Sequence, residues 1–486
     1  MKLFLHILSF SIWLPILCGI FLILINNYKN NEIKKYISLI SAIISFIPTL
    51  LIIYFFKNSE KNFQFSEKIH WIKCFNINYH LGIDGISLWF IPLTALTTLI
   101  TILLAWDNIK KNISQYFGLF LILSGLMIGV FSSIDSMLFY IFLETTLIPI
   151  FIIIGIWGGK KKIYATFKFF FYTLLGSITM LLALIYLYIK TKNFDITSWY
   201  NLPLTFNEQK IIFLAFFFAF AIKLPIWPFH TWLPEAHGEA PTNGSIILAA
   251  IMLKFGAYGI LRFLLPITPE ANKFFAPIII ILSLFSIVYI GLITIVQKDI
   301  KKLIAYSSIN HMGIVTIGIF LLNKIGILGA IIQMISHIFT SIAMFSLIGI
   351  IYEKTKTKKI NNLGKLIKKI PIFSTFFIIL SLANCGLPST SSFVGEFLVI
   401  ISAIKYNFYI GIITSTILIW SAIYSFLLIK RIIFDKTKKC SIKIIKDINK
   451  KEFFVLFIIT SLIFIIGIFP KIIITPLETS ITNLLS

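Results

Sequence analysis

The stretch AIKLPIWPFHTWLPEAHGEAPTNG, residues 221–244, interrupts a chain that is otherwise strongly apolar. It places Lys223 just before three prolines within ten positions, Pro225, Pro228 and Pro234. Proline removes a backbone donor and clashes with the preceding turn, so a helix that reaches this stretch has to break. At membrane depth a broken backbone survives only where protein or a water-filled cavity satisfies it. The stretch therefore predicts a polar site inside a membrane protein.

The composition predicts a polytopic membrane protein. Hydrophobic residues make up 58% of the 486 positions, and the mean hydropathy is +0.95. Apolar runs of about twenty residues, the length that crosses a bilayer core of roughly 30 Å, recur along the chain. The first run, residues 3–25, lacks the small-residue cleavage pattern of a secretory signal, so we interpret it as a retained first helix.

Charge and cysteine content exclude several classes of function. A net charge of +24 would suggest nucleic acid in a soluble protein, but here the basic residues lie in short loops, where membrane topology explains them. No G-x-G-x-x-G turn opens a helix after a strand, which argues against a nucleotide site. The cysteines lack the spacing of a zinc or iron–sulfur site, so no metal or other cofactor is expected in this chain. They are Cys18, Cys74, Cys385 and Cys440.

Windows of apolarity predict an all-α protein with fourteen membrane spans. The seventh and twelfth are too long for one straight helix, and each contains a polar, proline-bearing interruption: KLPIWPFH in the seventh and NCGLPSTSSFVGE in the twelfth. We therefore expect both helices to be broken. The spans are approximately 3–25, 36–56, 85–106, 116–133, 136–156, 167–189, 211–240, 244–265, 275–296, 302–322, 327–350, 372–404, 408–430 and 453–475.

The two interrupted spans stand five apart, and broken helices in corresponding positions indicate paired repeats with a site near the bilayer midplane. We expect one transmembrane domain, 1–486, that contains helices one to three (1–106), repeat one of spans 4–8 (116–265), repeat two of spans 9–13 (275–430) and a last helix (453–475). Most of the 43 Lys and Arg residues lie in loops after odd-numbered spans. The positive-inside rule places those loops in the cytoplasm and both termini on the periplasmic side.

Six ionisable residues fall inside the predicted spans. A single buried Glu or Lys can be half of a structural ion pair, and a lone His is often a hydrogen-bonded packing residue. Six such groups are harder to explain by packing, because each carries its own desolvation cost, and ionisable residues in a membrane mark polar pathways by default. The candidate proton-transfer residues are Glu144, Lys223, Lys254, His311, His337 and Glu396.

Other polar residues favour a simpler interpretation. We expect His230, Glu235, His237 and Glu239 to lie in a solvated loop near the surface, after the break. We expect Arg262 to extend from a span end toward water.

The chemistry that a Glu and Lys pair permits is proton handling. An approaching carboxylate changes how tightly a buried lysine holds its proton, so movement of Glu144 relative to Lys223 could switch the lysine between acceptor and donor. Histidine titrates near neutral pH and suits a relay position.

The residues also resemble a known family. FAIKLPIWPFHTWLPEAHGEAPTNGS (220–245), LAAIMLKFGAYGILRF (248–263), HLGIDGISLW (80–89) and DSMLFYIFLE (135–144) resemble the antiporter-like membrane subunits of NADH:quinone oxidoreductase, respiratory complex I. Glutamate at 396, where sister subunits carry lysine, is similar to the M type, whose mitochondrial counterpart is subunit 4.

The resemblance implies fourteen helices with two inverted five-helix repeats in the membrane arm of the complex. It implies proton transfer through Glu144, Lys223, Lys254 and Glu396, with His311 and His337 in a central hydrated axis. It also implies that NADH, FMN, iron–sulfur clusters and quinone are bound by partner subunits. We hypothesise that protons move from the cytoplasm toward Lys223, pass Lys254 and the histidines, and leave outward from Glu396, while Glu144 sets the proton affinity of Lys223. A bacterial inner membrane is the expected location.

Three alternatives remain open. The chain could be a subunit of a multisubunit cation/proton antiporter, which resembles complex I in the same helices. It could be a haem-bearing membrane oxidoreductase with His311 and His337 as ligands, although their surroundings fit hydration better. Finally, it could be a purely structural subunit with vestigial charges.

Overall fold

The structure is a computed structural model that describes residues 6–25, 30–200, 202–435 and 446–485. Cys440 and the first residues of the 3–25 span lie outside these ranges. Within them the chain is mostly helical, which confirms the expected polytopic helical membrane protein. The 12 helices long and apolar enough to cross a membrane are Ile7–Leu24, Asn31–Phe55, Gly85–Ala105, Ile113–Ser132, Ser136–Trp157, Lys162–Thr191, Thr242–Ile267, Pro269–Ile295, Ile300–Phe320, Lys324–Thr355, Phe408–Phe434 and Lys450–Ile468.

The two spans with polar interruptions are each formed by two shorter helices. In the seventh, α9 (Phe206–Lys223) ends directly before Pro225, and α10 (Trp232–Glu239) follows. In the twelfth, α18 (Pro371–Asn384) is followed by α19 (Ser391–Tyr406). The sequence between each pair contains proline, whose missing N–H cannot continue a helix.

The chain divides into two compact units. Unit 1 comprises Met1–Leu224, Ile251–Phe275 and Thr475–Ser486, and unit 2 comprises Pro225–Ala250 and Ala276–Ile474, both as far as they are described. The helices of unit 1 are α1 (Ile7–Leu24), α2 (Asn31–Phe55), α3 (Gly85–Leu88), α4 (Phe90–Ala105), α5 (Ile113–Ser132), α6 (Ser136–Thr145), α7 (Leu147–Trp157), α8 (Lys162–Thr191), α9, α12 (Leu253–Gly259) and α13 (Leu265–Ile267), with short turns η3 (Lys73–Phe75), η4 (Ile196–Trp199) and η6 (Ile260–Leu264).

Helix packing in unit 1 depends on small residues. A side chain at Gly19 of α1 would lie 2.5 Å from the Gly118 carbonyl oxygen of α5, and one at Gly125 would lie 2.3 Å from the Ile12 carbonyl oxygen. These glycines let the backbones of α1 and α5 approach closely, as is common between membrane helices.

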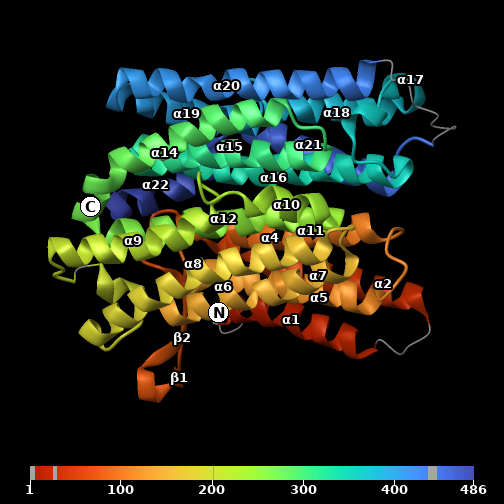
Figure 1. The fold of residues 1–486 in the computed structure, drawn as a ribbon. Coiled ribbons are helices and arrows are strands. Elements are labelled where there is room, and N and C mark those ends of the chain that lie inside the picture. The colour runs from red at the N-terminus through yellow and green to blue at the C-terminus, as the bar shows by residue number, and fades with distance from the viewer. Residues whose placement is uncertain (1–5, 26–29, 201, 436–445, 486) are drawn as a thin grey trace. The chain divides into compact units, whose positions relative to one another are not determined.

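Unit 1 also contains a β-hairpin, which the all-α prediction missed. Strands β1 (Gln64–Ile72) and β2 (Ile77–Ile83) pair antiparallel, and the turn between them includes Asn76 at φ 50°. Figure 1 shows the hairpin projecting from one side of the unit. The segment is short and mixed in polarity, and its pairing depends on register rather than on an apolar run, so a search for membrane spans passes over it.

The core of unit 2 is α16 (Lys324–Thr355), whose apolar window is entirely buried. It packs against α15 (Ile300–Phe320) and α19, and α19 packs against α20 (Phe408–Ile429) (Figure 1). Side chains of Asp299, Asn323 and Asn407 accept hydrogen bonds from the first turns of α15, α16 and α20, which fixes where these helices begin. The other elements in unit 2 are α10, α11 (Thr242–Ile247), α17 (Leu366–Lys369), α18, α21 (Lys450–Ile468), η7 (Ile360–Asn362) and η8 (Lys430–Phe434).

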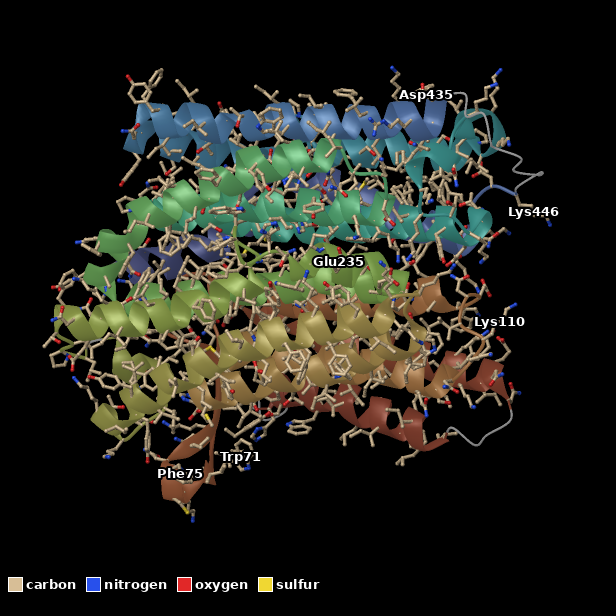
Figure 2. All side chains as sticks on the ribbon, in the orientation of Figure 1. Trp71, Phe75, Lys110, Glu235, Asp435 and Lys446 are labelled. Carbon is tan, nitrogen blue, oxygen red and sulfur yellow. The ribbon has the colours of Figure 1, made fainter. Side chains whose placement is uncertain are left out.

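Three elements run across the division between the units: η5 (Leu248–Met252), α14 (Pro269–Ile295) and α22 (Lys471–Leu485). Within unit 1, Figure 2 places Lys110 at one end of the helices, with Trp71 and Phe75 on the hairpin near the other end. Within unit 2, Asp435 and Lys446 lie together at one end. The end of unit 1 that carries the hairpin is called the hairpin face below.

Candidate functional site

Glu144 lies beside an interruption of the fifth span. Asp135 begins α6 by accepting hydrogen bonds of 3.0 Å from the backbone N–H groups of Met137 and Leu138. The helix ends at Thr145, and α7 begins two residues later. Pro149 in α7 has no N–H with which to bond the Thr145 carbonyl, which accounts for the discontinuity. The carboxylate is therefore placed where the helix is least regular.

Glu144 and Lys223 form an ion pair in unit 1. Lys223 is the last residue of α9, and its ammonium donates to Glu144 Oε1 at 3.0 Å. The Ser177 hydroxyl of α8 donates to the same oxygen. The lysine side chain is 5% exposed and that of the glutamate 18%. The predicted pair is thus in direct contact, and a third helix holds the carboxylate.

Lys254 lies on α12, buried at 0% exposure between two π-helical segments, η5 and η6. Such segments widen a helix locally and are frequent at functional sites. Gly256 lets α12 approach α9, because a side chain there would lie 2.6 Å from the Phe220 carbonyl oxygen and 2.7 Å from the Leu224 nitrogen. The structure therefore places Lys254 on the helix that packs against the end of the helix carrying Lys223.

Glu396 and His311 form the centre of a second buried site, in unit 2. Glu396 Oε1 lies 3.1 Å from His311 Nδ1 of α15, and it accepts a hydrogen bond of 3.1 Å from Gln333 Nε2 of α16. Glu396 is 0% exposed and His311 2%. In the turn before α19, Gly386 has φ 76°, and a side chain there would lie 2.8 Å from Glu396 Oε2. The glycine therefore both forms the turn and leaves room for the carboxylate.

Two more side chains extend this site. The Tyr424 hydroxyl of α20 lies 3.3 Å from His311 Nε2, so both ring nitrogens of His311 face polar groups. The His337 ring on α16 is 5.7 Å from the His311 ring, measured between centroids. Four helices thus contribute to one network, which contains three of the predicted residues.

Several buried polar atoms around Glu396 have no hydrogen-bond partner among the described residues. They are Glu396 Oε2, Gln333 Oε1 and Ser336 Oγ. Buried polar atoms of this kind in native proteins are normally satisfied, often by ordered water. The chemistry of the site therefore suits water as a further participant.

The expected solvated loop at 230–239 is wrong. Most of these residues form α10, which contains the 0% exposed His237, and His230, in the turn just before it, is 7% exposed. The His237 ring stacks on Phe345 at 4.8 Å, and Glu235, labelled in Figure 2, pairs with Lys302 at 2.7 Å.

The carbonyls that end α10 also have partners. The Lys301 ammonium donates to the Ala240 carbonyl at 2.8 Å, and Lys358 donates to that of Gly238 at 2.6 Å. Cations suit the negative end of a helix. The sequence showed the polarity of this stretch but not the distant lysines that let it be buried.

The expected position of Arg262 is also wrong. Rather than extending to water, Arg262 is 5% exposed and pairs with Asp84 of the third span's first turn. Its partner stands 178 residues earlier, which sequence spacing does not reveal.

Sequence reasoning also missed three uncharged contributors: Ser177, Gln333 and Tyr424. Serine and tyrosine are common in membrane helices and carry no distinguishing pattern. For Gln333 a signal existed, because it stands four residues before His337 and so shares a helix face with it.

Comparisons with known proteins agree with this geometry. The family model described as NADH:quinone oxidoreductase/Mrp antiporter, TM, matches residues 133–423. NADH-quinone oxidoreductase subunit M of Rickettsia prowazekii (strain Madrid E) is 44% identical over 99% of both chains. NADH-ubiquinone oxidoreductase chain 4 of Chondrus crispus is 44% identical over 96% of both. A chain of respiratory complex I from Thermus thermophilus with bound NADH superposes with a TM-score of 0.89 at 26% identity, covering 99% of this chain and 100% of that one.

The family model covers all six predicted residues of the two buried sites and ends one residue before Tyr424. The relatives align over nearly the whole length of the chain. The chain belongs to the membrane-subunit family shared by NADH:quinone oxidoreductases and Mrp antiporters, and within it stands with the proteins named subunit M and chain 4.

Proposed function

We propose that this chain is a proton-translocating membrane subunit of an NADH:quinone oxidoreductase. The observation that carries the proposal is the ion pair between Glu144 and Lys223, buried among spans at the end of a proline-broken helix. Buried, paired ionisable residues in a membrane segment are expensive and mark ion pathways. Relatives 44% identical over the whole chain are named as subunits of that enzyme.

Each unit supplies one proton-exchange site. In unit 1, Glu144 and Ser177 hold the Lys223 ammonium, and displacement of the carboxylate would make the lysine a better proton donor. In unit 2, Glu396 and His311 are close enough to share a proton, and Gln333 fixes the carboxylate that does so. Lys254 and His337 are proposed as relay positions, and protons leave outward from the site of Glu396.

Energy for this transfer comes from elsewhere in the complex. Moving one charge against the membrane potential costs about 2.3 kcal/mol per 100 mV. We propose that partner subunits bind NADH, FMN, iron–sulfur clusters and quinone, and that their redox chemistry drives the charge movements in this chain.

The topology proposed has fourteen spans in a bacterial inner membrane. The 12 described helices that are long and apolar enough to cross a membrane, together with the pairs α9/α10 and α18/α19, support this number. The two broken helices stand five spans apart, which supports inverted repeats at 116–265 and 275–430. The positive-inside rule makes the hairpin face the periplasmic one.

A cation/proton antiporter subunit is the second candidate, because the family model covers both kinds of protein. The two differ in energy source. An antiporter would acidify or alkalinise vesicles in response to a sodium gradient without NADH, whereas the proposed subunit would respond to NADH oxidation.

The test is NADH-driven acidification of inside-out vesicles that carry the assembled complex with Lys223→Ala. We expect acidification to be abolished, because Glu144 loses the group with which it exchanges charge. Lys210→Ala is the matched control: it lies near the start of the same helix, partly exposed, and its ammonium sits over the Phe206 ring at 4.0 Å. Full pumping by Lys223→Ala at normal electron transfer would reduce the ion pair to a structural role.

A further inference from the structure

A cavity of about 450 Å³, lined by both polar and apolar residues, opens into unit 1 from the hairpin face. Exposed residues Lys61, Asn62 and Ser66 lie around its mouth. At its floor lie Asp84 and Arg262. Water and protons from that side can therefore approach the ends of the third and eighth spans.

Arg262 is held at the floor from three directions. Its guanidinium pairs with Asp84, its Nε donates to the Tyr258 hydroxyl at 3.2 Å, and its Cζ lies 5.1 Å from the centre of the Phe63 ring. Asp84 is itself fixed, because the same carboxylate oxygen accepts from the N–H groups of Ile86 and Ser87 at 3.0 and 3.1 Å. A guanidinium keeps its proton in proteins, so the cavity ends at a permanently protonated group held in place by an ion pair with Asp84.

Behind Arg262 the eighth span leads to Lys254. Tyr258 stands four residues before Arg262 and four after Lys254, so the three share one helix face, with a rise of about 6 Å per step. The Tyr258 hydroxyl donates to the Phe131 carbonyl at 2.9 Å, and the rings of Phe131 and Phe139 pack around it, at 5.2 and 6.4 Å. The route from the cavity floor to the buried Lys254 is therefore short and passes aromatic rings.

We propose that Arg262, fixed by Asp84, is a seal that stops protons of the hairpin face from reaching Lys254. A fixed cation at the entrance to a pathway raises the electrostatic barrier to protons and other cations. Arg262 itself cannot relay a proton, because it does not release its own. The inference rests on the proposed function, since a seal is needed only where Lys254 exchanges protons with the other side.

The test measures passive proton leak without turnover. Inside-out vesicles containing the assembled complex are loaded with acid, and the loss of the gradient is followed without NADH. With Arg262→Met we expect leak to rise about tenfold, the factor that a barrier lowered by about 1.4 kcal/mol produces. Arg262→Lys keeps the charge and should stay near the wild-type rate. Lys57→Gln removes an exposed lysine that pairs with Glu60 outside the cavity, and it should change nothing.

A second substitution tests the route. Lys254→Met in the Arg262→Met background should restore the low leak, because the path behind the seal then ends in an apolar side chain. If the Arg262→Met complex does not assemble, the double variant Arg262→Gln with Asp84→Asn takes its place. It removes both charges together and leaves no unpaired carboxylate, and its proton leak answers the same question.

Two outcomes would overturn the seal. One is a variant without the Arg262 charge whose vesicles lose the proton gradient as slowly as those of the wild type. The other is a variant that stays tight but loses NADH-driven pumping, which would make Arg262 part of the path. Because leak is measured without NADH, its result is independent of whether Lys223→Ala abolishes pumping.

Discussion

The two buried carboxylates have different partners. Glu144 contacts a lysine and a serine hydroxyl and is 18% exposed, whereas Glu396 is 0% exposed and contacts a histidine and an amide. A lysine brings its own charge, but a histidine is charged only when protonated. An ionised carboxylate is costly to bury without a charged partner. Under the proposed function, the first site therefore moves charge by separating two ions, and the second by placing one proton on either of two groups.

The largest expected effect tests the first site, the ion pair between Glu144 and Lys223. Lys223→Met leaves Glu144 without its cation, so we expect loss of pumping together with a destabilisation of roughly 3 kcal/mol, typical when one partner of a buried pair is removed. Glu144→Gln with Lys223→Met should recover the stability but not the pumping. Thermal dissociation of the complex on native gels and vesicle acidification measure the two effects. A double variant as heat-labile as the single one would show that the pair is not the source of the stability.

A smaller effect tests the second site, through the hydrogen bonds around Glu396 and His311. Gln333→Leu removes the donor that fixes Glu396, and Tyr424→Phe removes the hydroxyl at His311 Nε2. Each loses one hydrogen bond of about 1 kcal/mol, so we expect about fivefold slower pumping. Gln297→Leu serves as the control: Gln297 lies just after α14, and its side-chain amide donates to the Ile293 carbonyl, away from the site. A pumping rate unchanged in both site variants would argue that Gln333 and Tyr424 only pack.

The smallest effect concerns a carboxylate outside the membrane. Burial acts to raise the pKa of Asp195, but hydrogen bonds from His80 and Thr197 outweigh it and lower the pKa to about 2. Because the pKa in the folded state is lowered, the ionised carboxylate stabilises the fold at pH values above the unfolded pKa near 4. This stabilisation is lost only as the pH falls through about 2. Asp195 itself therefore stays ionised between about pH 5 and 8 and adds no pH dependence of its own in that range.

Asp195→Asn should weaken that docking. It removes the charged acceptor of His80 and the partner of Lys68, and we expect the hairpin amides to exchange about threefold faster, as for a partly exposed ion pair. Hydrogen exchange of the intact complex measures this, with Glu60→Gln as the control. Hairpin protection as high in Asp195→Asn as in Glu60→Gln would contradict the assignment.

The sequence predicted those parts of the fold and site that depend on local chemistry. Pro225 had to end the helix of Lys223, and a carboxylate in an apolar span had to find a partner. It did not predict contacts that depend on distant segments, such as Arg262 with Asp84 or the lysines that cap α10. From sequence alone, a charged residue at a span end is equally compatible with contact to water and with an ion pair to a distant residue. Only the packing of the folded chain distinguishes the two.

The docking of α22 also has a consequence for the order in which unit 1 matures. The Gly85 N–H donates to the Ser480 hydroxyl, a contact between residues 395 positions apart. At roughly 5 to 20 residues per second, synthesis of the intervening segment takes roughly 20 to 80 s. During that time the Gly85 N–H lacks this acceptor, so the first turn of the third span gains its last contact only when nearly the whole chain has been made.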